Sequence, residues 1–202
     1  MTNDIDTIGA LETIYGTPLE TAVAKVADRL VPVYRDWIAA SRFCILSTVG
    51  PEGTDASPRG EDGPVVTALD DRTLALPDWH GNNRVDSLRN IVRDQRVSLL
   101  FMVSGSDNVV RVNGAARLTV DPALLERFAR NGARPRSIIV VQVREVYFQC
   151  ARALMRSRLW TSGDQSADLP TPGRILAAMS NDRVGGEDYD RDWPDRARTS
   201  LW

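Results

Sequence analysis

The amino-acid sequence predicts a mainly β protein, a closed antiparallel β-barrel with helical covers. Three observations support this class. Six or so short β-type runs are joined mainly by tight turns, helical patterns are inserted at few points, and strict βαβ alternation is absent. No Gly-rich phosphate loop of the GxGxxG or GxxxxGK type occurs, so a nucleotide-binding α/β fold is not indicated.

The length of the chain suits one domain with a real core, or one domain plus appendages, because 202 residues can bury a sizeable apolar interior. We expect residues 1–40 to form an N-terminal helical cover. Residues 41–160 are expected to form the barrel domain, and residues 161–202 a C-terminal extension.

The first forty residues carry helical signals. Thr17-Pro18-Leu19-Glu20 combines an N-cap Thr, Pro at the first helical position and Glu at the third, which is a capping box. The helix that it opens is expected to continue to Leu30. Pro32 breaks or kinks it, and a second short helix follows.

Three β-type segments follow in close succession. The run from Phe43 to Val49 is closed by Gly50-Pro51-Glu52-Gly53, a strong turn signal. A strand-like run from Val65 to Leu69 is separated by the turn Asp70-Asp71 from a third run, Thr73 to Pro77. The spacing predicts strands connected by short turns.

The stretch from Leu74 to Leu100 is central to the predicted fold. It reads as a strand, a turn, a helix and another strand. Gly81 and the paired asparagines Asn82 and Asn83 supply turn and N-cap chemistry for a helix that ends near Arg93. The apolar face expected for this helix consists of Val85, Leu88, Ile91 and Val92. Arg84 is expected in the first turn, where a cation opposes the helix dipole, so a bound anion would explain it.

The second half of the barrel begins with a strand from Val97 to Phe101. A long strand from Val109 to Val120 is interrupted at Asn113-Gly114, where glycine indicates a bulge or a barrel bend. Asp121-Pro122 caps a helix, and Ser137 to Phe148 forms the last strand.

The C-terminal part is expected to be mostly irregular. Short helices are predicted from Ala151 to Leu159 and from Arg174 to Ser180. The remainder is rich in Asp, Gly, Pro, Ser and Arg and is expected to be loosely ordered unless a partner covers it. Trp193 and Trp202 are costly in a free tail, so both are expected to pack on other groups.

Composition excludes several classes of protein. The net charge is −2 and the pI about 5.5, so no nucleic-acid binding is indicated. No apolar run approaches the length of a membrane span and no signal-peptide pattern is present, so no membrane association is expected. Cys44 and Cys150 lie in apolar runs and are predicted to be buried thiols, which favours a reducing, cytoplasmic setting.

Few residues could carry out chemistry unaided. His80 is the only histidine, no CxxC pair occurs, and Asp78 is its one nearby carboxylate, so no metal site is predicted. A hydrolytic triad would need His80, and no GxSxG motif accompanies it. We therefore expect any chemistry to belong to a bound cofactor.

Several motifs, in order and spacing, resemble the pyridoxamine 5'-phosphate oxidase-like FMN-binding proteins. They are Ser57-Pro58-Arg59-Gly60, the stretch from Asp70 to Leu74, Gly81-Asn82-Asn83-Arg84 with the helix after it, Arg96 to Phe101, and Arg111-Val112-Asn113-Gly114. The segment from Gln149 to Trp160 is similar to an uncharacterised bacterial subgroup of this family. The resemblance implies a split β-barrel as the FMN-binding domain, and a homodimer with FMN in a groove between the subunits.

The resemblance also implies a set of cofactor-binding residues. Asn82, Asn83 and Arg84 correspond to the phosphate-binding turn, and Arg59 is the second candidate for the phosphate. Pro77 and Asp78 correspond to positions whose backbone faces the flavin ring. The same resemblance places Val66 and Thr67 on the strand beneath the ring, and adds Arg111 and Arg156 to the expected cofactor-binding residues.

The leading functional hypothesis is an FMN-dependent oxidoreductase that acts on an unknown small molecule. The Lys, Tyr, Arg and Ser pattern with which true pyridoxamine phosphate oxidases hold their substrate is not found, so vitamin B6 oxidation is not favoured. The alternative is a protein that binds or senses flavin, deazaflavin or haem without turnover. Haem would require His80, the one candidate ligand. No catalytic residue is assigned.

Overall fold

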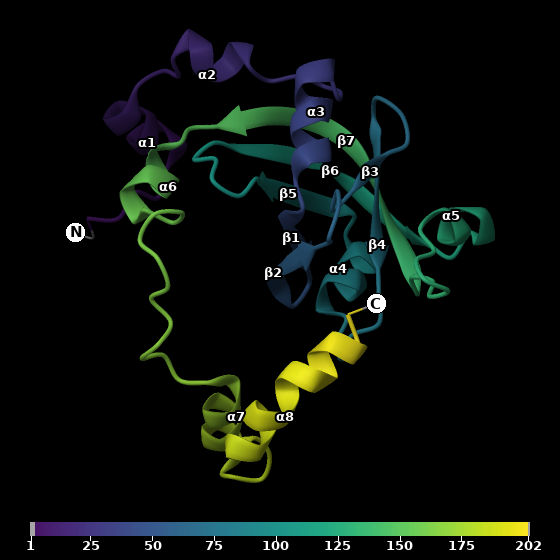
Figure 1. Ribbon diagram of the computed structural model, residues 1–202. Coiled ribbons are helices and arrows are strands. Elements are labelled where there is room, and N and C mark those ends of the chain that lie inside the picture. The colour runs from purple at the N-terminus through teal and green to yellow at the C-terminus, as the bar shows by residue number, and fades with distance from the viewer. Residues whose placement is uncertain (1–2, 202) are drawn as a thin grey trace.

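A seven-stranded antiparallel sheet forms the centre of the molecule (Figure 1). The computed structural model describes residues 3–201. The strands lie in the order β2-β1-β5-β6-β7-β4-β3. Their bounds are β1 Phe43–Gly50, β2 Gly53–Gly60, β3 Thr67–Ala68, β4 Thr73–Asp78, β5 Arg96–Met102, β6 Val109–Thr119 and β7 Ser137–Gln149. The expected mainly β class with helical covers is confirmed.

The sheet curls into a barrel that is split rather than closed. Within the described residues, β2 pairs only with β1, and β3 pairs with β4 only at Leu74 and Ala75. The outer edge of β2 and the last three residues of β4 therefore have no strand between them. The split barrel that the family resemblance implied is confirmed, whereas the closed barrel expected from the strand pattern alone is not formed, because the ladder stops at this gap.

Residues 53–60 form a full strand that the sequence did not predict. Ser57-Pro58-Arg59-Gly60 has the composition of a turn, yet Pro58 lies in register with Ile45 of β1. Proline is tolerated here because β2 is an edge strand, where a missing N–H leaves no neighbouring carbonyl unpaired. The tight turn after Gly50 is confirmed, and it sets the β1–β2 register.

The expected irregularity at Gly114 is confirmed, and its cause is a close backbone approach. The β6–β7 register shifts between Asn113 and Gly114, and the unmatched residue, Arg144, belongs to β7. A Cβ built on Gly114 would lie 2.1 Å from the carbonyl oxygen of Gln142, so only glycine fits. The bulge lets β6 and β7 stay paired over their whole length.

The core fills the inside of the curled sheet. Its largest fully buried side chains include Phe101, Leu46, Leu74, Leu76, Leu99, Ile139 and Val141. A second, smaller cluster of Ala75, Ile138 and Val140 lies on the other face of β4 and β7, under Leu124, Leu125 and Phe128. The helix α5 Pro122–Arg127, with the predicted Asp121 cap, provides this cover. The apolar run of β7 is therefore buried on both faces within one chain.

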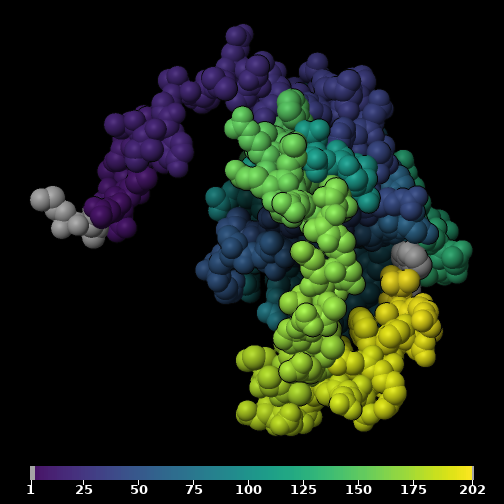
Figure 2. All heavy atoms as spheres, turned by 60° about the vertical axis from the view of Figure 1, so that its left-hand side comes forward, coloured from purple at the N-terminus to yellow at the C-terminus, as the bar shows by residue number. Residues whose placement is uncertain are grey.

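The other helices differ in how far they are buried. Their bounds are α1 Ile8–Tyr15, α2 Glu20–Ala24, α3 Pro32–Ala40, α4 Asp86–Arg93, α6 Arg152–Ser157, α7 Pro172–Ser180 and α8 Gly186–Thr199. α3 buries Ile38 in the core, whereas α1 and α2 bury no residue, and Figure 2 shows α1 projecting from the body.

The predicted capping box is wrong: Leu19 is the N-cap of α2, which ends at Ala24.

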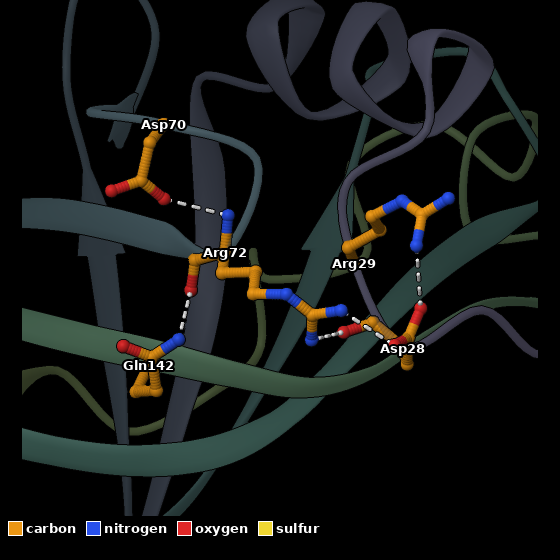
Figure 3. Close-up of polar contacts among 5 residues, drawn as sticks. All are labelled: Asp28, Arg29, Asp70, Arg72 and Gln142. Carbon is orange, nitrogen blue, oxygen red and sulfur yellow. Dashed lines mark hydrogen bonds and ion pairs between the residues drawn. The ribbon is translucent and has the colours of Figure 1, made fainter.

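The segment between α2 and α3 is held to the barrel by polar contacts (Figure 3). The Arg72 guanidinium donates to the carboxylate of Asp28 at 2.6 Å and to its carbonyl oxygen at 2.9 Å. The hydrogen bond from Arg72 holds the pKa of Asp28 below its usual range. The Arg72 carbonyl in turn accepts from the Gln142 side chain at 3.1 Å. One arginine therefore connects the N-terminal segment, the β3–β4 turn and β7.

The C-terminal part contains more helix than expected. The predicted helix ending at Ser180 is confirmed as α7, but α8 was not predicted, because its sequence is polar and contains Pro194. Asp190 of α8 accepts hydrogen bonds from Thr171 and from the backbone N–H of Gly173. These bonds join α7 and α8 into a hairpin. Trp193 stacks on Tyr189, one turn earlier in α8, but it stays 48% exposed, so the expected packing is only partial. Trp202 lies outside the described residues.

Candidate functional site

A pocket of about 510 Å³ occupies the gap in the barrel. One wall is the outer edge of β2, from Asp55 to Gly60, and the other is the end of β4, from Leu76 to Asp78. The turn formed by residues 79–85 and the start of α4 close one end. Its volume lies within the range of small-molecule and cofactor sites.

Arg59 and Asp78 form an ion pair across the gap. Arg59 Nη1 lies 2.6 Å from Asp78 Oδ1, and the two side chains are only 20% and 14% exposed. The Nε–H of Arg59 is buried and has no hydrogen-bond partner in the described structure. A half-buried guanidinium with an unused donor fits a site that receives an acceptor from a ligand.

Cys44 lies behind this pair, in register with Arg59 on β1. Burial raises the pKa of the Cys44 thiol to about 12, although the nearby Arg59 charge acts in the opposite direction. The thiol is therefore protonated at neutral pH, and Cys44 is the buried structural cysteine that the sequence predicted. Cys150 is exposed, so that prediction is wrong: β7 ends at Gln149 and the chain turns outward there.

The turn before α4 has an unusual backbone. Asn83 and Val85 have φ angles of 61° and 52°, and Asn82 Oδ1 accepts from the Arg84 backbone N–H at 3.1 Å. Val85, not an asparagine, is the N-cap of α4, and it offers no side-chain cap. Arg84 therefore precedes the helix, and the expectation that it lies in the first helical turn is wrong.

Arg84 extends into solvent. Its guanidinium pairs with Asp86, two residues further along, and the two side chains are 80% and 42% exposed. Ion pairs this exposed contribute little to stability, so Arg84 can exchange Asp86 for another anion at small cost.

The expected apolar face of α4 is only partly right, since Ile91 is buried but Val92 is exposed.

Arg136 is a further cation in this pocket that the sequence did not indicate. It directly precedes β7, and its Nη1 donates to Asn83 Oδ1 at 2.7 Å. Its backbone N–H donates to the Asp78 carbonyl at 2.8 Å, which places it at the end of β4. Only the β4–β7 pairing brings it here, so no local motif could have identified it.

A buried carboxylate lies at the other end of the pocket. Glu61 has only 5% of its side chain exposed, accepts from Trp79 Nε1 at 2.6 Å, and lies 3.6 Å from Arg130. These contacts fix the Trp79 ring at the rim. His80 also lines the pocket, but no group of three potential metal ligands exists within residues 3–201.

Hydrogen bonds between side chains attach α4 to the β1–β2 hairpin. Buried Ser87 donates to Asp55 at 2.5 Å, and Asn90 donates to Thr48 Oγ1 at 3.1 Å. A Cβ on Gly50 would meet the Asn90 side chain at 2.2 Å, so the helix packs tightly there. The start of α4, and with it the turn, is fixed relative to β2.

The structure brings together part of the predicted set. The pocket is lined by Arg59, Pro77, Asp78, Asn82, Asn83 and Arg84. Val66 is buried in the core and Thr67 pairs with Ala75, so neither lines it. Arg111 lies on β6 beside Tyr147, and Arg156 on α6; both are outside the pocket.

Comparison with known proteins identifies the family. A family model described as pyridoxamine 5'-phosphate oxidase matches residues 30–150, more than half of the chain. The chain therefore belongs to the pyridoxamine 5'-phosphate oxidase-like family, as its motifs indicated. A comparison with curated proteins gave no match.

Solved structures similar to the chain have low sequence identity. HupZ from Group A Streptococcus is 16% identical, with a TM-score of 0.47, over 57% of this chain and 90% of that one. An FMN-binding protein from Syntrophomonas wolfei is 14% identical, with a TM-score of 0.48, over 69% and 97%. An FAD-binding protein from Mycobacterium smegmatis is 16% identical, with a TM-score of 0.42, over 61% and 97%.

Proposed function

We propose that this chain binds FMN in the pocket between β2 and β4 and serves as a flavin-dependent oxidoreductase for a small molecule. The observation that carries this proposal is the unpartnered, buried Nε–H of Arg59 within a pocket of cofactor size. Membership of the pyridoxamine 5'-phosphate oxidase-like family adds support. A bound flavin would supply the redox chemistry, which no side chain of the pocket can supply.

The phosphate is proposed to lie at the turn that precedes α4. Arg84 and Arg136 offer guanidinium donors there, and Asn82 and Asn83 offer amides. Arginine forks suit a phosphate dianion, and the weakly held Arg84–Asp86 pair can open for it. The ring would then lie toward Pro77 and Asp78, where the edge of β4 has no strand partner.

The residues around the ring would orient it and exclude water. Trp79 is fixed by Glu61 and presents an aromatic surface at the rim. Asp78 is held by Arg59, so its carboxylate has a fixed position beside the proposed ring. Val66 and Thr67 would support the ring indirectly, through the β3–β4 pairing.

Flavin binding without turnover is the second candidate. Each carboxylate that lines the pocket already has a donor within the chain: Asp55 has Ser87, Glu61 has Trp79, Asp78 has Arg59 and Asp86 has Arg84. No carboxylate is thus left unengaged to act as a general acid or base. This arrangement favours holding a cofactor, and the chemistry would then depend on the flavin alone.

A homodimer is proposed as the working form. Arg111 and Arg156 lie outside the pocket of their own chain, so they could meet a flavin only from a second copy. The outer face of β5, with half-buried Leu100 and Met102, offers apolar surface for such contact. Scattering that gives a monomer at micromolar concentration with flavin bound would contradict this.

Within residues 3–201, no helix has the length and apolarity needed to cross a bilayer.

The test of the proposed function is titration of the purified protein with FMN and with riboflavin. We expect flavin absorption bands to shift on binding and FMN to bind more tightly than riboflavin, because only FMN carries the phosphate. Uptake of neither flavin would overturn the proposal. Reduction by a nicotinamide donor, followed by reoxidation with a panel of acceptors, separates an oxidoreductase from a flavin carrier.

A further inference from the structure

The N-terminal segment before Lys25 packs on nothing in its own chain. All residues from 3 to 24 are exposed, and Figure 2 shows α1 projecting from the body. A helix of eight residues that contains Gly9 is at best marginally stable by itself in water. α1 therefore needs a surface to pack on, and the described part of its own chain does not provide one.

Apolar side chains form one stripe along α1. Ile8, Leu11 and Tyr15 follow the i, i+3, i+7 spacing that places side chains on one face of a helix, and Ile14 flanks them. All four are exposed, Ile8 and Tyr15 by 70% and 75%. An exposed stripe with this spacing is typical of a helix that binds in an apolar groove.

The charged side chains of this segment are all acidic. They are Asp4, Asp6, Glu12 and Glu20, and no Lys or Arg precedes Lys25. Glu12 follows Ile8 by four positions, so it borders the apolar stripe of α1. A surface that receives α1 should therefore be apolar, with a cation at its margin.

A groove with these properties lies between the segment of residues 24–37 and the sheet, at the start of β6 and the end of β7. Its volume is about 570 Å³, and it shares no lining residue with the flavin pocket. The apolar lining includes Val26, Val33, Trp37, Val110 and Phe148. Val33 is 70% exposed and Phe148 is 44% exposed, so much of this apolar surface is uncovered within the described chain.

Lys25 is the one charged residue that lines the groove. No carboxylate of the described residues lies within ion-pair distance of it, and its Nζ lies 4.7 Å from the centre of the Phe148 ring. Its carbonyl accepts from the Tyr34 hydroxyl at 2.6 Å, and that hydroxyl also accepts from the Phe148 backbone N–H at 3.4 Å. The fold thus fixes a cation without a counterion beside an apolar groove, which complements the acidic, apolar α1.

We propose that α1 of one copy binds in this groove of a second copy, with Ile8, Leu11 and Tyr15 in the groove and Glu12 beside Lys25. A second copy necessarily carries a helix with the matching stripe and charge, and exchange in both directions closes a two-fold dimer. Residues 16–19 and α2 give α1 a reach of up to about 30 Å from Lys25, so it can extend to the groove of a neighbouring copy.

This contact is distinct from the apolar outer face of β5. Val110 and Phe148 are paired in register, and Val110 belongs to the buried core, so the pair lies on the core side of the sheet. No residue of α1 or of the groove lines the flavin pocket. The proposal therefore does not depend on flavin binding.

Disulfide cross-linking tests which chain receives the helix. Ile14→Cys, at the edge of the stripe, is combined with Val33→Cys in a Cys150→Ser background and oxidised; Cys44 is buried and does not react. We expect covalent dimers of twice the chain mass. A disulfide within one chain, or no disulfide, would overturn the proposal.

Val92→Cys in place of Val33→Cys is the matched control. Val92 is 74% exposed, close to the 70% of Val33, and it lies on α4 outside the groove. This pair should give no covalent dimer. A yield equal to that of the Val33→Cys pair would mean random collision and would overturn the proposal.

The affinity of the dimer tests the apolar stripe. Leu11→Asp places a charge in the stripe, whereas Thr13→Asp places the same charge on the opposite face of α1. Sedimentation equilibrium should give a dimer dissociation constant raised about ten-fold or more by Leu11→Asp and about unchanged by Thr13→Asp. Equal effects of the two variants, no effect of either, or an unmodified chain that stays monomeric would overturn the proposal.

Reversed charges test the pairing of Glu12 with Lys25. Glu12→Lys and Lys25→Glu each bring like charges together and should each raise the dissociation constant about ten-fold. The double variant restores opposite charges and should recover most of the affinity. A double variant that dimerises no better than either single one would overturn the proposed placement of α1 in the groove.

Discussion

Arg59 and Arg84 line the same pocket, but the protein holds them in different ways. Arg59 is half-buried and pairs across the barrel gap with Asp78, nineteen residues away in the chain. Arg84 is exposed and pairs with Asp86 in the same turn. The first pair links β2 to β4, two strands far apart in the chain, whereas the second is a local surface contact. Stability should therefore depend on Arg59, and ligand binding should depend more on Arg84.

This difference can be tested most directly by removing Arg59. Arg59→Ala leaves the Asp78 carboxylate half-buried without its cation, and loss of one partner of a buried ion pair costs about 3 kcal/mol. The midpoint of urea unfolding should fall accordingly. Arg93→Ala breaks the exposed pair with Glu52 and should change the free energy of unfolding by less than about 1 kcal/mol.

A double variant identifies the cause of that loss. Arg59→Met combined with Asp78→Asn removes both charges, and it should recover most of the stability lost in Arg59→Ala. If the double variant is as unstable as the single one, the cost comes from lost packing of the arginine stem rather than from the unpaired carboxylate. The attraction between the Arg59 and Asp78 charges would then not be what stabilises the arrangement of β2 and β4 across the gap.

Features that depend on contacts between neighbouring residues could be predicted from the sequence, whereas features that depend on the arrangement of the whole sheet could not. The β1 strand, the Asp121 cap and the position of the bulge at Gly114 follow from local patterns, and all are confirmed. Residues 53–60 were missed because their proline and glycine are acceptable only at an edge, which is a property of the sheet and not of the segment.

The site was predictable to the same degree. The asparagine turn and Arg59 carry local motifs, and the structure places both in the pocket. Arg136 reaches Asn83 only because β7 pairs with β4, and Glu61 meets Trp79 only across the gap. The exposure of Cys150 likewise depends on where β7 ends. Contacts between segments that are far apart in the chain determine all three of these placements. The local pattern of a single sequence does not reveal such contacts.

Arg84→Ala tests the other side of the comparison. The variant should leave the free energy of unfolding nearly unchanged, because the Arg84–Asp86 pair is exposed. FMN affinity should fall by roughly one to two orders of magnitude, since hydrogen bonds to charged groups contribute about 1.5–3 kcal/mol. Riboflavin should bind the variant and the unmodified chain alike. Equal losses for both flavins, or none, would mean that Arg84 does not hold the phosphate.

Ser87→Ala tests whether the turn must be held in place. Buried Ser87 donates to Asp55, so its loss leaves a half-buried carboxylate without that donor and should cost about 1 kcal/mol of stability. FMN affinity should fall several-fold as the start of α4 loosens, with riboflavin less affected. Thr54→Ala, at an exposed position of the same strand outside the pocket, should change neither quantity. An unchanged Ser87→Ala variant would show that the backbone alone fixes the turn.

The smallest expected effect is a gain. Asp86→Asn removes the carboxylate that competes with a phosphate for Arg84, and it removes a negative charge beside the proposed dianion. FMN affinity should rise about three-fold, because an exposed charge pair contributes up to about 1 kcal/mol. The first turn of α4 loses a favourable acid, so stability should fall by a few tenths of a kcal/mol.

The salt dependence of that gain decides how to interpret it. If Asp86 acts by competing charge, the gain should shrink as ionic strength rises, and riboflavin affinity should not change at any salt concentration. If FMN affinity instead falls several-fold in Asp86→Asn, Asp86 serves to orient Arg84 toward the phosphate. Arg84 would then be a positioned binding residue like Arg59, and the contrast between the two arginines would be one of burial alone.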